Sequence, residues 1–144
     1  VIEKYNFKIS TKSFQRTYRK GSNLDDIHEN GIHDYMKWIK FGYGRCSDHV
    51  SKDIRMGYMK RDEGINLIKK YDHIKPDRDL NRWLNYVNMS EDEFDHIADT
   101  FRDTNIWSID DNTWYKKNIF GEYESFGKVN LNKEQIEKYK RING

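Results

Sequence analysis

Three features that the sequence has little of limit what the chain can be. It contains a single cysteine, Cys46, which excludes an internal disulfide and a structural zinc site built from several cysteines. It has no apolar run near the roughly 18 residues of a membrane span, so we expect a cytoplasmic protein. Its 26 Lys and Arg residues are balanced by 24 Asp and Glu residues, so the chain has no general excess of positive charge that would attract nucleic acid.

Large aliphatic residues are also scarce. Leu, Ile, Val and Phe make up 31 of the 144 residues, about 22%, just above the level of roughly 20% below which chains tend to be disordered. The net charge of +2 and the aromatic content of 15% indicate a folded chain. Tyr and Trp are therefore expected to supply packing that Leu supplies elsewhere.

The most unusual stretch combines two glycines, an aromatic ring and two cations. It has the sequence Lys-Phe-Gly-Tyr-Gly-Arg, from Lys40 to Arg45. Gly42 and Gly44 allow positive φ angles or a close approach to a ligand, and the flanking cations add fixed positive charge. This composition is typical of an anion-binding turn.

A helix is predicted directly after this turn, with Ser47 as its N-cap and a body from Asp48 to about Arg55. Its first N–H groups would then face the same anion. We predict a substrate or anion site, without a catalytic residue or a metal, formed by Lys40, Gly42, Gly44, Arg45, Asp48 and Arg55. In the alternative interpretation, Gly44 only ends the preceding helix and Arg45 pairs with Asp48.

Much of the remaining sequence has helical periodicity. A helix beginning near Asn23 and three later helices, over 62–71, 80–87 and 91–101, are expected. The last of these starts with a capping box, Ser90 to Glu93, and the last two helices are expected to pair. The predicted shared core consists of Trp83, Leu84, Phe94, Ile97 and Phe101.

Two further segments are assigned from local composition. The polar, basic stretch from Ser10 to Asn23 is interpreted as a solvated linker, with a substrate-contacting loop as the alternative. Strand-like segments on either side of Asp110-Asp111-Asn112 predict a small β-hairpin near residues 105–116. A terminal helix is expected from Lys133 to Arg141.

Residues 40–72, KFGYGRCSDHVSKDIRMGYMKRDEGINLIKKYD, resemble the C-terminal segment of the N-acetyl sugar amidotransferases, a family of PP-loop ATPases. The family pattern is a lysine, Phe-Gly-x-Gly-Arg, a small polar pair, Asp, a nearby Ser, an acidic-Ile-Arg triplet and a Thr-Arg-Glu-Glu helix start ending in Tyr-Asp. This chain matches the pattern at Lys40, Phe41, Gly42, Gly44, Arg45, Asp48, Ser51, Asp53, Ile54, Arg55, Arg61, Glu63, Tyr71 and Asp72. It departs at Lys60, where the family tends to have a capping Thr, and at Asp62 and Gly64. The resemblance extends over residues 1–105.

The resemblance implies a mainly α fold, the helical C-terminal region of a PP-loop α/β enzyme. Residues 1–22 would be the end of the α/β domain and a linker, 23–104 the helical domain, and 105–144 a peripheral, aromatic-rich extension with the terminal helix. The family's ATP-binding Ser-Gly-Gly-x-Asp-Ser loop does not occur in this sequence, which begins with Val1 rather than Met. We therefore expect a C-terminal fragment of a larger enzyme that is inactive alone.

The activity implied by the resemblance is conversion of an acetamido sugar to an acetamidino sugar, for bacterial lipopolysaccharide and O-antigen or for flagellin glycans. The full-length enzyme would use ATP and Mg²⁺ in the missing N-terminal PP-loop domain, a glutaminase subunit that supplies ammonia, and a nucleotide-linked sugar. No cofactor is expected in this fragment, and no nucleic acid as partner. The alternative is a non-catalytic helical module that docks on a protein partner through residues 40–55.

Overall fold

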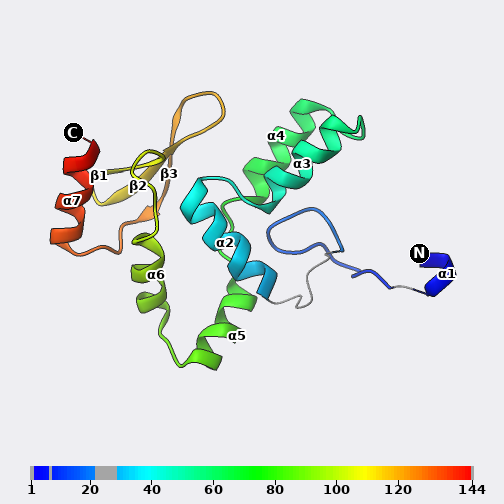
Figure 1. Cartoon of the computed structure of the whole chain (residues 1–144), viewed down its shortest axis with the longest axis horizontal. Coiled ribbons are helices and arrows are strands. Elements are labelled where there is room, and N and C mark those ends of the chain that lie inside the picture. The colour runs from blue at the N-terminus through cyan, green and yellow to red at the C-terminus, as the bar shows by residue number, and fades with distance from the viewer. Residues whose placement is uncertain (1, 7, 22–28, 144) are drawn as a thin grey trace. The chain divides into compact units, whose positions relative to one another are not determined.

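The computed structural model describes residues 2–6, 8–21 and 29–143 (Figure 1). The chain divides into two compact units, which we call the first unit (Val1–Tyr35 with Gly44–Asp79) and the second unit (Met36–Tyr43 with Leu80–Gly144). The fold is mainly α with a small antiparallel sheet, as predicted. The helix start expected near Asn23 lies outside the described residues.

Two neighbouring helices, α3 (Arg45–Arg55) and α4 (Arg61–Tyr71), form much of the first unit (Figure 1). Helix α3 ends in a Schellman motif: Gly57 has a φ of +75°, and Tyr58 N donates to Asp53 O at 2.8 Å. Helix α4 begins after Lys60, which provides no side-chain cap. The loss of the family's capping Thr at this position is therefore not replaced.

Gly64 allows α3 and α4 to approach closely. A Cβ at this position would lie 2.4 Å from Val50 Cγ1 and 3.1 Å from Ile54 Cδ1. Any larger residue would therefore push the two helices apart. This contact gives a physical reason for glycine where the sequence departs from the family pattern.

Within the described residues before position 88, three more helices are present. They are the short α1 (Ile2–Tyr5), α2 (Glu29–Phe41) and α5 (Asp77–Val87). Helices α2 and α5 each contribute residues to both units. Gly31 in α2 leaves room for the start of α5, because a Cβ there would lie 2.4 Å from Asp79 Oδ2.

The second unit contains a three-stranded antiparallel sheet of order β1 (Trp107–Asp110), β2 (Thr113–Lys117) and β3 (Tyr123–Lys128). The predicted hairpin is confirmed. Asp111 and Asn112 have φ angles of +41° and +56° between the paired ends of β1 and β2, which is typical of a type I′ turn. Strand β3 was not predicted because it is mostly exposed and has no long apolar alternation.

Aromatic side chains fill the core of the second unit. Trp107 and Trp114 are 1% and 0% exposed, and Trp107 Nε1 donates to Ile39 O at 2.7 Å. Helix α7 (Lys133–Asn143) contacts β1, where the Tyr139 hydroxyl donates to Trp107 O at 2.8 Å. The predicted domain limits stay a prediction, but this aromatic-rich segment supplies core residues rather than only a periphery.

Helix α6 (Glu91–Asp99) begins as predicted. Glu93 N donates to Ser90 Oγ at 3.3 Å and Ser90 N donates to Glu93 Oε2 at 2.9 Å, which completes the capping box. Leu84 is buried, and the half-buried Trp83 contacts the Phe94 ring edge-on at 5.9 Å between centroids. This part of the predicted helix pair is confirmed.

The rest of the predicted core on this helix is wrong. Ile97 and Phe101 are 43% and 49% exposed. The buried face instead follows Phe94, Ala98 and Arg102, at i, i+4 and i+8, whereas the prediction used i, i+3 and i+7. Helix α6 ends at Asp99, and beyond its end the Arg102 side chain is buried while Phe101 is exposed.

Candidate functional site

The residues of the predicted anion-binding turn are divided between the two units. Lys40 and Gly42 belong to the second unit, and Gly44 and Arg45 to the first. Gly42 ends α2 with a φ of +72°, and its N–H donates to Trp38 O at 2.8 Å. Gly44 has a φ of −114° and a ψ of −166°, an extended conformation open to other residues, so its role is different.

Gly44 makes room for a carboxylate. A Cβ there would lie 2.8 Å from Asp72 Oδ1. Gly44 N donates to Asp72 Oδ2 at 2.9 Å, while Ser47 donates to the same carboxylate through N at 3.2 Å and Oγ at 2.5 Å. The predicted N-cap Ser47 is wrong, because α3 starts at Arg45 and its N-cap is Gly44. The N–H groups of Gly44 and Ser47 at the start of α3 therefore donate to Asp72 rather than to an external anion.

Arg16 fixes the backbone around this carboxylate. It is 2% exposed, and its guanidinium donates to the main-chain oxygens of Ile74, Asp72 and, at 3.2 Å, Asp34. Burial lowers its pKa to about 10, which leaves it charged at neutral pH. The solvated-linker interpretation is wrong for Arg16 and Thr17, which are both buried.

Arg45 is paired but partly accessible. Its Nε and Nη2 lie 3.0 and 2.9 Å from Asp34 Oδ1. These hydrogen bonds raise the pKa of the guanidinium. The Asp34 side chain is 7% exposed and that of Arg45 is 25% exposed. Asp34, which the sequence analysis did not select, therefore holds Arg45 in place.

The segment around Thr17 brings a second guanidinium and a histidine contact to α3. Arg19 Nη2 lies 2.6 Å from Asp53 Oδ1, and His49 Nδ1 lies 2.8 Å from Thr17 Oγ1. Burial, reinforced by nearby guanidinium charges, lowers the pKa of His49 to about 4. The imidazole is therefore neutral at pH 7 and acts as a hydrogen-bonding group rather than a cation.

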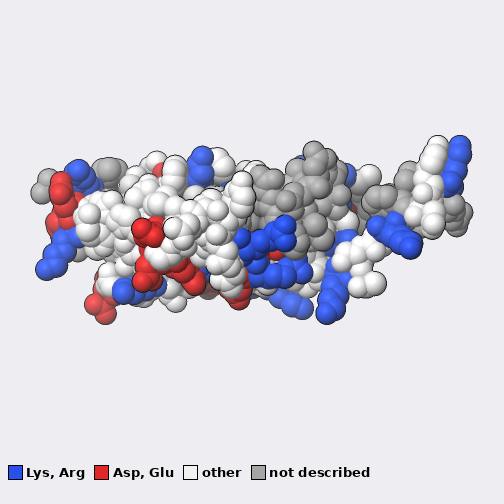
Figure 2. All heavy atoms as spheres, turned by 90° about the horizontal axis from the view of Figure 1, so that it is seen from below, with Lys and Arg blue, Asp and Glu red and all other residues white. Residues whose placement is uncertain are grey.

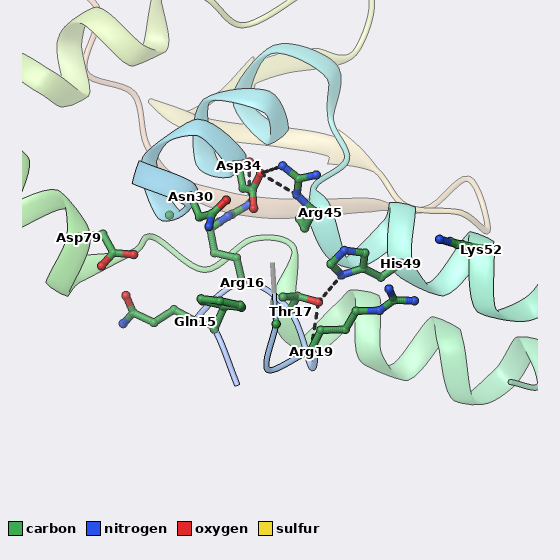
Figure 3. Close-up of a pocket in the computed structure, with 13 residues that line it drawn as sticks. Gln15, Arg16, Thr17, Arg19, Asn30, Asp34, Arg45, His49, Lys52 and Asp79 are labelled. Atoms are coloured by element: carbon green, nitrogen blue, oxygen red, sulfur yellow. Dashed lines mark hydrogen bonds and ion pairs between the residues drawn. The ribbon is translucent and has the colours of Figure 1, made fainter. Parts of the chain in front are cut away.

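These residues line a cavity of about 360 Å³ in the first unit (Figure 3). Its charged lining consists of four cations and two carboxylates: Arg16, Arg19, Arg45, Lys52, Asp34 and Asp79. The cations outnumber the carboxylates, and the volume falls within the range of about 300–1,000 Å³ that is usual for ligand pockets. Both properties favour a small anionic ligand.

One face of α3 contributes two of the cations and the neutral His49 to this lining. Arg45, His49 and Lys52 recur at i, i+4 and i+7, which places them on one side of the helix. This spacing is visible in the sequence and could have identified His49 and Lys52, which the sequence analysis missed. The opposite end of the cavity gave no such signal, because its residues come from a loop and from the starts of two helices.

Arg45 is the one predicted site residue that lines this cavity. Arg55 is exposed in the last turn of α3, about 15 Å along the helix axis from Arg45 at 1.5 Å per residue, so the two do not converge. Lys40 is exposed, with Nζ 5.3 Å from the centroid of the Phe41 ring. Asp48 is half-buried in the first turn of α3. A ligand-binding role for these residues stays a prediction.

A second cavity, of about 610 Å³, lies within the second unit. Gly42 borders it, and a Cβ on Gly42 would lie 2.7 Å from Ile106 Cγ2. Its cations are Lys116 and Lys117, and Lys117 Nζ lies 5.2 Å from the centroid of the Tyr123 ring. Because its charges are carried by long lysine side chains rather than by anchored guanidinium groups, the cavity of the first unit is the stronger candidate.

The structure adds three observations on other classes of site. Among the described residues, no group of three or more His, Cys, Asp or Glu is arranged to hold a metal ion. Within the same parts of the chain, no helix has the length and apolar character needed to cross a membrane. Cationic and anionic side chains both appear on the face shown in Figure 2, in keeping with the balanced composition.

Comparison with known proteins identifies a family for this chain. The family model described as "LPS biosynthesis protein WbpG-like, C-terminal domain" matches residues 2–120. The matched range includes every residue that lines the cavity of the first unit. A search of curated proteins gives no match.

Proposed function

The chain belongs to the family of LPS biosynthesis protein WbpG-like, C-terminal domains, and we propose that it is the C-terminal part of an ATP-dependent sugar amidotransferase. The enzyme would convert an acetamido sugar into an acetamidino sugar for lipopolysaccharide, with flagellin glycans as a second destination. The family description supports the biosynthetic setting, and the resemblance of residues 40–72 to the sugar amidotransferases supports the reaction.

The proposed chemistry explains why a nucleotide is consumed. An amide is a weak electrophile, so its oxygen attacks the α-phosphorus of ATP and pyrophosphate leaves. Ammonia then adds to the activated carbon, loses a proton, and displaces AMP, which carries away the former amide oxygen. In this proposal an N-terminal PP-loop domain holds ATP and Mg²⁺, and a cytoplasmic glutaminase subunit supplies the ammonia.

The proposed contribution of this chain is to bind the anionic substrate. The observation that carries it is the cationic cavity of the first unit, in which Arg45 and Arg19 are anchored by carboxylates and Lys52 lies nearby. A nucleotide-linked sugar carries phosphate groups, and guanidinium and ammonium groups are the side chains that bind phosphate in proteins.

The proposal can be tested with the full-length protein. Supplied with ATP, Mg²⁺, ammonia and nucleotide-linked N-acetyl sugars, it should release AMP and form an amidino sugar detectable by mass spectrometry. Arg45→Ala should lower turnover in a protein that still folds, although its melting temperature should fall because the buried Asp34 loses its partner. The exposed Arg61→Ala should leave turnover unchanged. The 144-residue chain alone should release no AMP. AMP release by that chain, or full activity of Arg45→Ala, would contradict the proposal.

A protein-interaction module is the second candidate, and one surface favours it. Met56 and Tyr58, in the turn between α3 and α4, are 53% and 76% exposed. Adjacent exposed apolar side chains are typical of docking surfaces. If docking were the whole function, Tyr58→Ala would weaken association with the glutaminase or the N-terminal domain, and Arg45→Ala would leave both association and turnover unchanged. The two variants therefore separate the candidates.

A further inference from the structure

The cavity of the first unit has two chemically different ends. We call one the cationic end: Arg19, Arg45 and Lys52. We call the other the amide and carboxylate end: Gln15, Asn30 and Asp79. Figure 3 shows the two sets on opposite sides, with Arg16 and Asp34 between them. We infer that the cavity binds a phosphorylated N-acetyl sugar, with its phosphate at the cationic end and its hydroxyl and acetamido groups at the other.

The cationic end is held in position before a ligand arrives. Asp34 engages Arg45 through Nε and Nη2, and Asp53 engages Arg19 through Nη2. Each guanidinium has five N–H donors, so these pairs leave donors available for phosphate oxygens. Fixed guanidinium groups lose less conformational entropy on binding phosphate than mobile side chains do. Lys52 adds an exposed ammonium on the same face of α3.

A buried charge between the two ends adds to the positive potential. Arg16 donates to main-chain carbonyl oxygens, and among the described residues no carboxylate forms a direct ion pair with it. Asp72 and Asp34 lie close enough to offset part of its charge, and the remainder adds to the positive potential in the cavity. An anion at the cationic end would benefit from this charge without contacting it.

The amide and carboxylate end suits the polar groups of a sugar. Gln15 and Asn30 carry amides, which both donate and accept hydrogen bonds, and Asp79 carries a carboxylate that accepts them from hydroxyl groups. Gln15 Oε1 is buried, and within the described parts of the chain it has no hydrogen-bond partner. A buried acceptor without a partner favours a donor from a ligand, and the N–H of an acetamido group is such a donor.

The size of the cavity limits the ligand. A volume of about 360 Å³ is near the lower end of the range of about 300–1,000 Å³ for ligand pockets. It suits a phosphorylated monosaccharide better than a complete nucleotide-linked sugar, whose base and ribose would extend outside. The identity of the sugar as N-acetylated rests on the proposed function, whereas the position of the phosphate rests on the cavity itself.

Calorimetry on the 144-residue chain tests the inference with four probes: N-acetylglucosamine 1-phosphate, UDP-N-acetylglucosamine, N-acetylglucosamine and inorganic phosphate. Both phosphorylated sugars should bind at least about tenfold more tightly than either separate part. Lys52→Ala should lower the affinity for the phosphorylated probes and for inorganic phosphate about tenfold, and leave the affinity for the neutral sugar unchanged. Gln15→Ala should lower the affinity for the three sugar-containing probes and leave the affinity for inorganic phosphate unchanged. Lys60→Ala, an exposed lysine outside the cavity, is the matched control.

Equal affinities for inorganic phosphate and the phosphorylated sugars would overturn the inference. Equal losses of affinity in Lys52→Ala and Lys60→Ala would also overturn it, once thermal melting shows that both variants are folded. The expected pattern in this chain, combined with no amidine formation by the full-length protein, would overturn the proposed function and leave the cavity assignment intact. Amidine formation unaffected by Lys52→Ala and Gln15→Ala would overturn the cavity assignment alone.

Discussion

Each of the two compact units contains a buried arginine, and the two arginines are stabilised in different ways. Arg16, in the first unit, donates to three main-chain carbonyl oxygens. Arg102, in the second unit, donates from Nε to Asp99 Oδ1 at 2.8 Å, and its guanidinium lies 4.0 Å from the centroid of Trp107 and 4.8 Å from that of Trp114. One arginine is held by the polypeptide backbone, and the other by a buried carboxylate and aromatic rings.

This difference separates the parts that the two units play. Hydrogen bonds to the backbone fix the loop that carries Arg16 around a cavity, so the first unit combines precise polar positions with open space. Cation–π contacts fill the space around Arg102, so the second unit gains stability from dense packing. Loss of packing in the second unit should therefore change stability alone, whereas loss of polar contacts in the first should change stability and binding together.

The largest effect is expected from Trp107→Ala. Trp107 is 1% exposed, contacts Trp38 edge-on at 5.0 Å between centroids, and donates Nε1 to Ile39 O. Its removal leaves a large cavity and an unpaired carbonyl, and we expect a loss of about 3–5 kcal/mol in the free energy of unfolding. Chemical denaturation followed by tryptophan fluorescence measures this loss. An unchanged midpoint would show that the aromatic cluster does not stabilise the unit.

A matched pair, Arg16→Leu and Arg102→Leu, tests the comparison directly. Arg16→Leu leaves buried carbonyl groups unpaired and should cost about 2–4 kcal/mol. Arg102→Leu should cost more, about 3–5 kcal/mol, because the buried Asp99 carboxylate loses its charge partner and keeps only the hydrogen bonds from Asn130. Denaturation should reveal this order, and calorimetry should show loss of N-acetylglucosamine 1-phosphate binding in the first variant only. Equal losses of stability and of binding would refute the distinction.

The features that the sequence predicted correctly have local signals. The capping box at Ser90 to Glu93 needs two residues three positions apart, and the hairpin turn at Asp111-Asn112 needs two residues that tolerate positive φ. Neither depends on a distant part of the chain. The same is true of the i, i+4, i+7 spacing of Arg45, His49 and Lys52, which was present in the sequence but not used.

The features that the sequence analysis missed depend on long-range contacts. Asp72 lies 25 residues beyond Ser47 in the chain but takes the place of the expected external anion at the start of α3. Arg16 lies in a segment whose composition is typical of a linker, and its burial follows from carbonyl groups as far away as Ile74. Asp72 is the last residue of the family motif, but helical periodicity alone does not predict that its carboxylate accepts hydrogen bonds from the start of α3.

A smaller effect is expected in the packing of α3 against α4. Gly64→Ala gains about 1 kcal/mol of helix propensity, but its methyl group would overlap the buried Val50 side chain and cost about 1–3 kcal/mol. The overlap should dominate, giving a net loss of about 1 kcal/mol measurable by thermal unfolding. Asn66→Ala, an exposed site on the same helix, is the control and should not destabilise. A stabilised Gly64→Ala variant would show that the helices can separate without cost.

The smallest effect concerns pH, and it arises in the first unit. Burial and the charges of Arg19 and Arg45 lower the pKa of His49 from its ordinary 6.5 to about 4, while Asp34 and Asp48 partly oppose this shift. Between these two values the unfolded chain binds a proton at this imidazole and the folded chain does not. Stability should therefore fall as the pH decreases from about 6.5 to about 4, with no contribution from His49 above that window.

His49→Asn isolates this contribution, because an asparagine amide can keep the hydrogen bond to Thr17 Oγ1 without titrating. The melting temperature of the variant should decrease less than that of the original chain between pH 6.5 and 4.5. The lowered pKa of Asp53, caused first by the Tyr18 hydrogen bond, acts at lower pH, because its stabilising effect is lost only as the pH falls through values below about 3.8. If the melting temperatures of His49→Asn and the original chain decrease equally across the window, the pKa of His49 is not lowered in the folded chain. The imidazole then adds a positive charge to the cationic end of the cavity in mild acid.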